Sequence, residues 1–143
     1  MIKSITLGEE IVITTKNKVG LLADIATMLA NQGVNIEAIA GYEIGDTAKL
    51  RLITDANLGI VKELKEKKYK SVAEMEVLLI EIMNKPGALK VVTMELGKNK
   101  VDMNCLYVTS SHSSGSGGGT FSKMVLSTSD NEKAMALLSK FIE

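Results

Sequence analysis

Hydrophobic and polar positions follow two spacings along this chain, and each spacing predicts one kind of element. Ile11–Thr15 and Val77–Ile82 are runs of β-branched and aliphatic residues, which suit strands. Leu22, Ile25 and Leu29 are three and four residues apart, which places one apolar stripe along a helix. The pattern therefore predicts strands and helices in alternation.

The pattern occurs twice. Residues 16–39 overlay residues 83–106 at a constant offset of 67, and residues 48–64 overlay residues 122–138 at an offset of 74. The two offsets differ by seven residues, which the Ser- and Gly-rich stretch around Ser113–Gly119 accounts for. Each copy is predicted to run strand, helix, strand, strand, helix, strand.

The later elements of each copy follow from local patterns. Residues 34–38 and 101–105 alternate between apolar and polar side chains, which indicates strands with one buried face. Gly33 suits the left-handed residue that ends a helix. The third strands are expected near Lys49–Thr54 and Lys123–Thr128, and a second helix follows each of them.

The order of elements predicts both the fold class and the domains. The last strand of the first copy is expected near Lys70–Ala73, which predicts one domain at residues 1–74 and another at 75–143. Two units in the order β-α-β-β-α-β match the ferredoxin-like α+β pattern, in which both helices cover one face of an antiparallel sheet.

Composition narrows the classes of function. Lys plus Arg and Asp plus Glu number 17 each, so the chain has no net charge to attract nucleic acid or anionic lipid. Two Phe and three Tyr are too few for the stacking surface of an RNA-binding protein. The apolar run Val77–Ile80 is too short to cross a membrane. A single cysteine and an N-terminus without a secretion signal lead us to expect a cytoplasmic protein.

The turn between the first strand and the first helix is the most faithfully repeated feature. It reads Asn17-Lys18-Val19-Gly20 in the first copy and Asn84-Lys85-Pro86-Gly87 in the second. Glycine lets the backbone approach a neighbour, and the free N–H groups at a helix start can receive a carboxylate. Alternatively, glycine and proline only shape a tight turn, with Pro86 at the first helical position and asparagine capping the helix.

Two sequence runs resemble the ACT domain signature. They are NKVGLLADIATMLANQGVNI and NKPGALKVVTMELGKNKVDM, and the resemblance covers residues 10–143 as a tandem pair. It implies binding of an amino acid or a related effector at interfaces between paired modules. The residues that it implies for the site are Asn17, Lys18, Val19, Gly20, Leu21, Leu22 and Asn35, and in the second copy Asn84, Lys85, Pro86, Gly87, Ala88, Leu89 and Asp102.

Both copies depart from the signature. Val19 replaces the family's proline in the first copy, whereas Lys100 and Asp102 replace its glycine and asparagine in the second. A carboxylate at position 102 would repel a ligand carboxylate. We therefore expect the first copy to bind better than the second.

Little else in the sequence indicates chemistry. His112 lies in a Ser- and Gly-rich loop, Ser110–Gly119, and is expected to be solvated; Cys105 alternates with apolar residues and is expected to be a small buried side chain. No nucleophile and base form a pair, so we expect no catalysis, no metal and no cofactor.

The charged residues 62–70 are interpreted as a solvated helix face. Ser129 and Glu132 read as a capping box.

Two functions remain open. The first is a sensor in which a small-molecule effector, an amino acid, stabilises one packing of the modules over another. The alternative is a regulatory subunit that docks on an amino-acid biosynthetic enzyme. In both cases Ile39 and Leu106, which are expected to point away from the helices, predict burial by pairing of the copies and formation of a homodimer.

Overall fold

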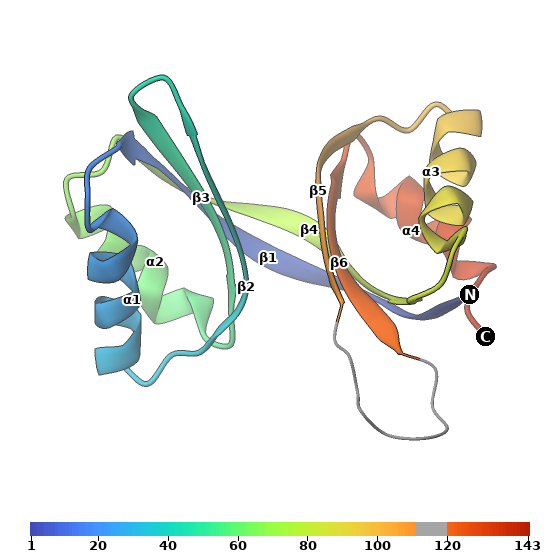
Figure 1. Cartoon of the computed structure of the whole chain (residues 1–143), viewed down its shortest axis with the longest axis horizontal. Helices are drawn as coiled ribbons and strands as arrows, with labels where there is room; N and C mark the ends of the chain where they lie inside the picture. The colour runs from blue at the N-terminus through green and yellow to red at the C-terminus, as the bar shows by residue number, and fades with distance from the viewer. Residues whose placement is uncertain (111–119) are drawn as a thin grey trace. The chain divides into compact units, whose positions relative to one another are not determined.

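The computed structural model describes residues 1–110 and 120–143. The order of elements there is β1 (Ile2–Lys16), α1 (Leu21–Asn31), β2 (Ile36–Ile44), β3 (Thr47–Thr54), α2 (Asn57–Glu66), β4 (Ser71–Met83), α3 (Ala88–Lys98), β5 (Met103–Ser110), β6 (Phe121–Thr128) and α4 (Asn131–Ser139) (Figure 1). Helices and antiparallel strands are mixed, as the sequence predicts. No helix in the described parts of the chain is long and apolar enough to span a bilayer.

The chain forms two compact units. The first unit is Glu9–Met75, and the second unit combines Met1–Gly8 with Glu76–Glu143. The expected domain 1–74 is therefore wrong for its first eight residues. The reason is nonlocal, because Ile2 and Ile5 are buried in the core of the second unit.

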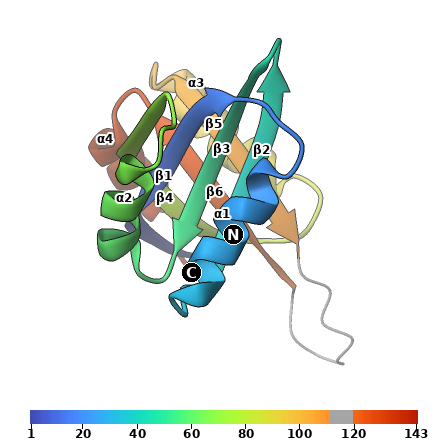
Figure 2. The same cartoon turned by 90° about the vertical axis from the view of Figure 1, so that its left-hand side faces the viewer.

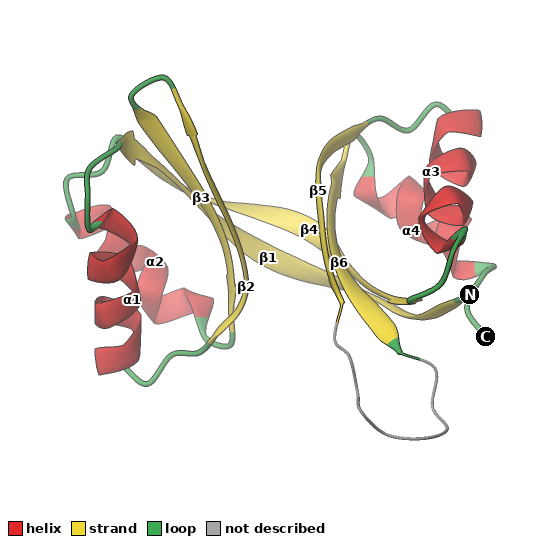
Figure 3. Cartoon of the chain, viewed as in Figure 1, coloured by secondary structure: helices red, strands yellow, loops and turns green. Residues whose placement is uncertain are grey.

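In the first unit, the strands lie in the order β2-β3-β1-β4. β3 pairs antiparallel with both β1 and β2, with Leu50 opposite Ile13 and Gly41. α1 and α2 lie side by side over one face of this sheet (Figures 2 and 3). The core between sheet and helices includes Ile11, Ile13, Ile25, Leu29, Leu50, Leu52, Ile60 and Leu64.

In the second unit, the strands lie in the order β1-β4-β6-β5. Its core includes Leu78, Ile80, Val92, Leu96, Met124, Leu126 and Leu138. The sequence led us to expect a final strand after α4, but the chain there forms only an isolated bridge between Ile142 and Ile2. The N-terminal part of β1 takes the fourth place in this sheet.

Several contacts recur at the two sequence offsets. Asn57 Nδ2 donates to the Glu9 carbonyl at 2.8 Å, and Asn131 Nδ2 donates to the Glu76 carbonyl at 2.9 Å. A β-bulge interrupts β2 between Ile36 and Ala38 and β5 between Met103 and Cys105. The repeat read from the sequence therefore corresponds to repeated contacts in the structure.

The N-termini of α3 and α4 differ from the sequence prediction. Pro86 precedes the N-cap Gly87 and does not occupy the first position of α3. Asp130, not Ser129, caps α4 and accepts from the Lys133 N–H at 3.0 Å. Ser129 Oγ instead accepts from the Asp102 N–H at 3.0 Å, which ties the start of β5 to the end of β6.

The buried side of the two longer helices also begins one residue earlier than expected. Leu21 and Ala88 are buried, whereas Leu22 and Leu89 are exposed. On the second strands, Ile39 is exposed as expected, but Leu106 packs against the core of the second unit.

Candidate functional site

The two strand-to-helix turns have the same backbone geometry. Gly20 and Gly87 are the N-caps of α1 and α3, and their φ angles are 87° and 89°. Glycine is favoured at both because positive φ strains any residue with a Cβ. Among the described residues, a Cβ at either position would have no neighbouring atom within 4 Å. No described side chain therefore covers either turn.

Asn17 holds the first turn against a hairpin. Its N–H donates to the Asp46 carbonyl at 2.7 Å, and its Nδ2 donates to Glu43 Oε2 at 2.8 Å. The Leu21 N–H donates to the Lys18 carbonyl at 3.3 Å, which closes the turn. No side chain caps α1, so the interpretation of Asn17 as a helix cap is wrong.

The second turn is held in a similar way. The Asn84 N–H donates to the Thr120 carbonyl at 2.8 Å, and the Ala88 N–H donates to the Lys85 carbonyl at 3.2 Å. Pro86 and Gly87 are exposed, as are Val19 and Gly20 in the first turn. The two turns therefore offer backbone and side chains to solvent at equivalent positions.

Asn35 and Asp102 lie away from the turns of their own units. Each follows a helix whose other end carries the glycine, and an 11-residue helix is about 16 Å long. The Asn35 N–H donates to Asp55 Oδ1 at 3.0 Å, at the far end of the sheet. Within one unit, the structure does not bring these two residues to the predicted site.

A pocket of about 640 Å³ lies beside the turn of the first unit. The end of β1, one side of α1 and the segment after α2 contribute to it. Its lining residues are Thr15, Lys16, Lys18, Leu21, Asp24, Thr27, Met28, Lys67, Lys68 and Tyr69. Of these, only Lys18 and Leu21 belong to the site predicted from sequence. Residues 67 and 68 were instead interpreted as part of a solvated face.

Charges surround the phenol of Tyr69 in this pocket. Lys18 Nζ lies 3.4 Å from Asp24 Oδ2, and both side chains are mostly exposed. Burial raises the pKa of Tyr69 above its ordinary value, and the negative charge of Asp24 raises it further while Lys18 opposes both. An exposed pair of this kind contributes little to folding stability, so both groups are available to a ligand.

The second unit has a smaller pocket beside its turn. Its volume is about 160 Å³, and Lys85 is the charged residue in its lining. The other lining residues are Ile82, Met83, Asn84, Ala88, Leu89, Val108, Ser122 and Met124. The two turns are thus alike in backbone and different in the pockets that adjoin them.

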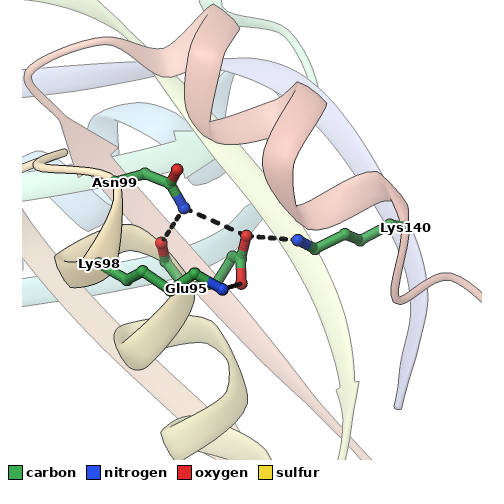
Figure 4. A network of polar contacts seen from close by, with 4 residues as sticks. All are labelled: Glu95, Lys98, Asn99 and Lys140. Atoms are coloured by element: carbon green, nitrogen blue, oxygen red, sulfur yellow. Dashed lines mark hydrogen bonds and ion pairs between the residues drawn. The ribbon is translucent and has the colours of Figure 1, made fainter.

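Buried Glu95 organises a polar network in the second unit (Figure 4). Its carboxylate accepts from Lys140 and from Asn99 Nδ2, the latter at 3.2 Å, and Lys98 Nζ lies 3.8 Å away. The hydrogen bond from Lys140 is the largest cause that lowers the pKa of Glu95, and burial opposes it. The network joins α3 to the residue after α4.

The remaining candidates from the sequence are Cys105, His112 and the loop around His112. Cys105 is half-buried, less buried than expected. His112 and most of the loop Ser110–Gly119 lie outside the described residues. Within residues 1–110 and 120–143, no group of three His, Cys, Asp or Glu side chains could hold a metal ion.

Residues 10–68 match the family model of the ACT domain. The matched segment lies within the first unit. No curated protein matches the chain.

Solved structures share the fold over nearly the whole chain. The crystal structure of protein BT0572 from Bacteroides thetaiotaomicron has 25% identity and a TM-score of 0.80, covering 96% of this chain and 90% of that chain. The ligand-free regulatory subunit of aspartate kinase from Thermus thermophilus has 9% identity and a TM-score of 0.64, with each chain fully covered. Structures of aspartokinase alpha and beta subunits give 13% identity and a TM-score of 0.60, covering 98% of this chain and 97% of that chain. The last two likenesses show the fold alone.

Proposed function

We propose that the chain is a non-catalytic, cytoplasmic regulatory protein made of two tandem ACT modules that senses an amino acid. The observation that carries the proposal is the open glycine turn of the first unit, which lies inside the segment that matches the ACT domain. The second unit supports a tandem pair because it repeats the turn, the bulge and the asparagine contact.

In this proposal, the ligand binds at the turn Asn17–Leu22. An amino-acid carboxylate would accept from free N–H groups at the start of α1, where the helix dipole favours negative charge. The Lys18 ammonium lies on the same turn and adds a second attraction. The turn of the second unit is a weaker candidate because its pocket is smaller and mostly apolar.

Calorimetric titration against the twenty amino acids tests this function. Binding by roughly 4 to 8 kcal/mol, which corresponds to millimolar to micromolar dissociation constants, is expected for a ligand of this size. The titration should detect at least one amino acid in this range. Silence from all twenty at millimolar concentration would contradict the proposal.

A second candidate function is docking on an amino-acid biosynthetic enzyme. It is supported by the likeness in fold and length to the regulatory subunit of aspartate kinase from Thermus thermophilus. The exposed Ile39, Tyr42 and Ile44 on β2 offer an apolar edge for such a partner. Affinity purification from the native lysate should return such an enzyme with the wild-type chain and lose it with Ile44→Glu.

A further inference from the structure

The pocket of the first unit carries an excess of positive charge. Lys16, Lys18, Lys67 and Lys68 line it, and Asp24 is the acidic residue among its lining. Among the residues that the structure describes, these five side chains make one ion pair, between Lys18 and Asp24. Four ammonium groups and one carboxylate leave three positive charges beside a concave surface.

The fold itself does not require most of these charges, because the second unit has the same turn geometry and keeps only Lys85, at the position of Lys18. The segment after the second helix corresponds in the two units: the Lys67 N–H donates to Leu64 at 3.1 Å, and the Phe141 N–H donates to Leu138 at 3.0 Å. At the two repeat offsets, positions 16, 24, 67 and 68 correspond to Met83, Val91, Phe141 and Ile142. The excess of lysines in the lining therefore distinguishes the first unit from the second.

From this lining we infer that the effector of the first unit carries two carboxylates and one amine, which is the chemistry of an acidic amino acid. The inference rests on the proposed sensing function and specifies its ligand. Two lysines come from the strand and its turn, and two come from the segment after α2, so each side of the pocket offers ammonium groups to one carboxylate. Asp24 offers the partner for the ligand's amine.

The rest of the pocket agrees with this ligand. Leu21 and Met28 are apolar and lie on α1, and Tyr69 packs against the core, so together they can contact a short methylene chain. The volume of about 640 Å³ falls within the range of about 300 to 1,000 Å³ of small-molecule sites. A basic amino acid would be repelled, and a neutral one would leave two lysines without a partner.

Three matched ligands test the inference by calorimetry. Glutamate carries both carboxylates and the amine, glutamine lacks one charge at nearly the same shape, and glutarate lacks the amine. We expect glutamate or aspartate to bind at least tenfold more tightly than glutamine or asparagine. We also expect this preference to shrink as salt is raised, since exposed charges are screened.

Variants locate the binding to this pocket. Lys67→Gln with Lys68→Gln should weaken glutamate binding at least tenfold. The control is Lys62→Gln with Lys65→Gln on α2, which changes the charge of the same unit by the same amount outside the pocket lining and should change affinity less than twofold. Asp24→Asn should weaken the binding of glutamate, because it removes the partner of the ligand's amine, and should strengthen the binding of glutarate, which has no amine.

The outcomes separate this inference from the proposed function. Glutamate-selective binding that is lost in the Lys67 and Lys68 variant supports the inference. Binding of a neutral or basic amino acid with equal or greater affinity overturns it and leaves the sensing function standing. Equal loss of binding in the control variant also overturns it, because the effect would then be one of net charge. Silence from every amino acid overturns both.

Discussion

At the scale of residues, Gly33 and Lys100 have the same left-handed backbone conformation at corresponding positions of the two units. Both lie just after the first helix of their unit, and their φ angles are 69° and 59°. The first is glycine and the second is lysine. A left-handed conformation costs a residue with a Cβ about 1 to 2 kcal/mol, so Lys100 is strained where Gly33 is not.

Lys100→Gly should therefore stabilise the second unit. Relief of the backbone strain is partly offset by the greater conformational freedom of glycine in the unfolded chain. The free energy of unfolding should therefore rise by about 0.5 to 1 kcal/mol. Gly33→Ala should lower stability by about 1 kcal/mol. Urea denaturation of both variants checks the pair. Destabilisation by Lys100→Gly would show that its side chain makes contacts that outweigh the strain.

Gly20→Ala should weaken amino-acid binding about tenfold. The methyl group has room, but it strains the turn and stands beside the amides that receive the carboxylate. Gly33→Ala is the control, because it introduces the same strain at the other end of α1. Calorimetry of the two variants should give a large loss of affinity for the first and less than a twofold change for the second. An equal loss of affinity in both variants would show that the loss comes from lower folding stability and not from the turn itself.

At the scale of elements, α3 and the end of α4 are linked through Glu95. The folded state lowers the pKa of this carboxyl below its ordinary value. A group of this kind contributes stability that is present above its unfolded pKa and is lost as pH falls through its folded pKa. The link should therefore weaken in acid.

Glu95→Gln should make the second unit less stable than wild type at pH 7. The difference in the free energy of unfolding between wild type and variant should narrow as the pH falls below about 4.3, the ordinary pKa of a glutamate. The wild-type carboxyl then becomes protonated and loses the charge that the variant also lacks. Urea denaturation between pH 3 and pH 7 measures this. Glu74→Gln, an exposed carboxylate on β4, is the control. A difference in stability that stays constant from pH 3 to pH 7 would contradict a stabilising role for the ionised Glu95 carboxylate.

The sequence predicts most elements because they depend on local spacing. Helix α1 is found from its apolar stripe, although the buried side begins at Leu21 and leaves Leu22 exposed. β4 was expected as two strands and is one, since Ser71–Met83 carries no turn residue that would interrupt it. The first eight residues were misassigned because their partners lie some 70 to 140 positions away.

The candidate site is less predictable for the same reason. The turn Asn17–Gly20 is found because it is local and repeated. The pocket also needs Lys67, Lys68 and Tyr69, which lie some fifty residues further along and gain their position only when β4 enters the sheet. No spacing rule in a single sequence connects the two segments.

At the scale of the whole molecule, each unit has an edge strand of the sheet with exposed apolar residues. Ile44 on β2 is 68% exposed, and Val108 on β5 is 43% exposed. Unpaired apolar edges favour association with another copy. We expect a homodimer at micromolar concentration, which sedimentation equilibrium measures.

Ile44→Glu should weaken this dimer about tenfold or more, because it places a charge in an apolar contact. Leu58→Glu is the control: Leu58 is 90% exposed, but it lies on α2 and not at a sheet edge. Sedimentation of both variants should shift only the first toward monomer. A monomeric wild type at micromolar concentration would contradict the predicted dimer.

The most direct measurement of the central claim follows the backbone amides by NMR while an amino acid that binds in calorimetry is added. We predict saturable shifts at Gly20, Leu21 and Leu22, with much smaller shifts at Gly33, just after the other end of α1. A bound ligand that leaves the amides of this turn unmoved would contradict the central claim.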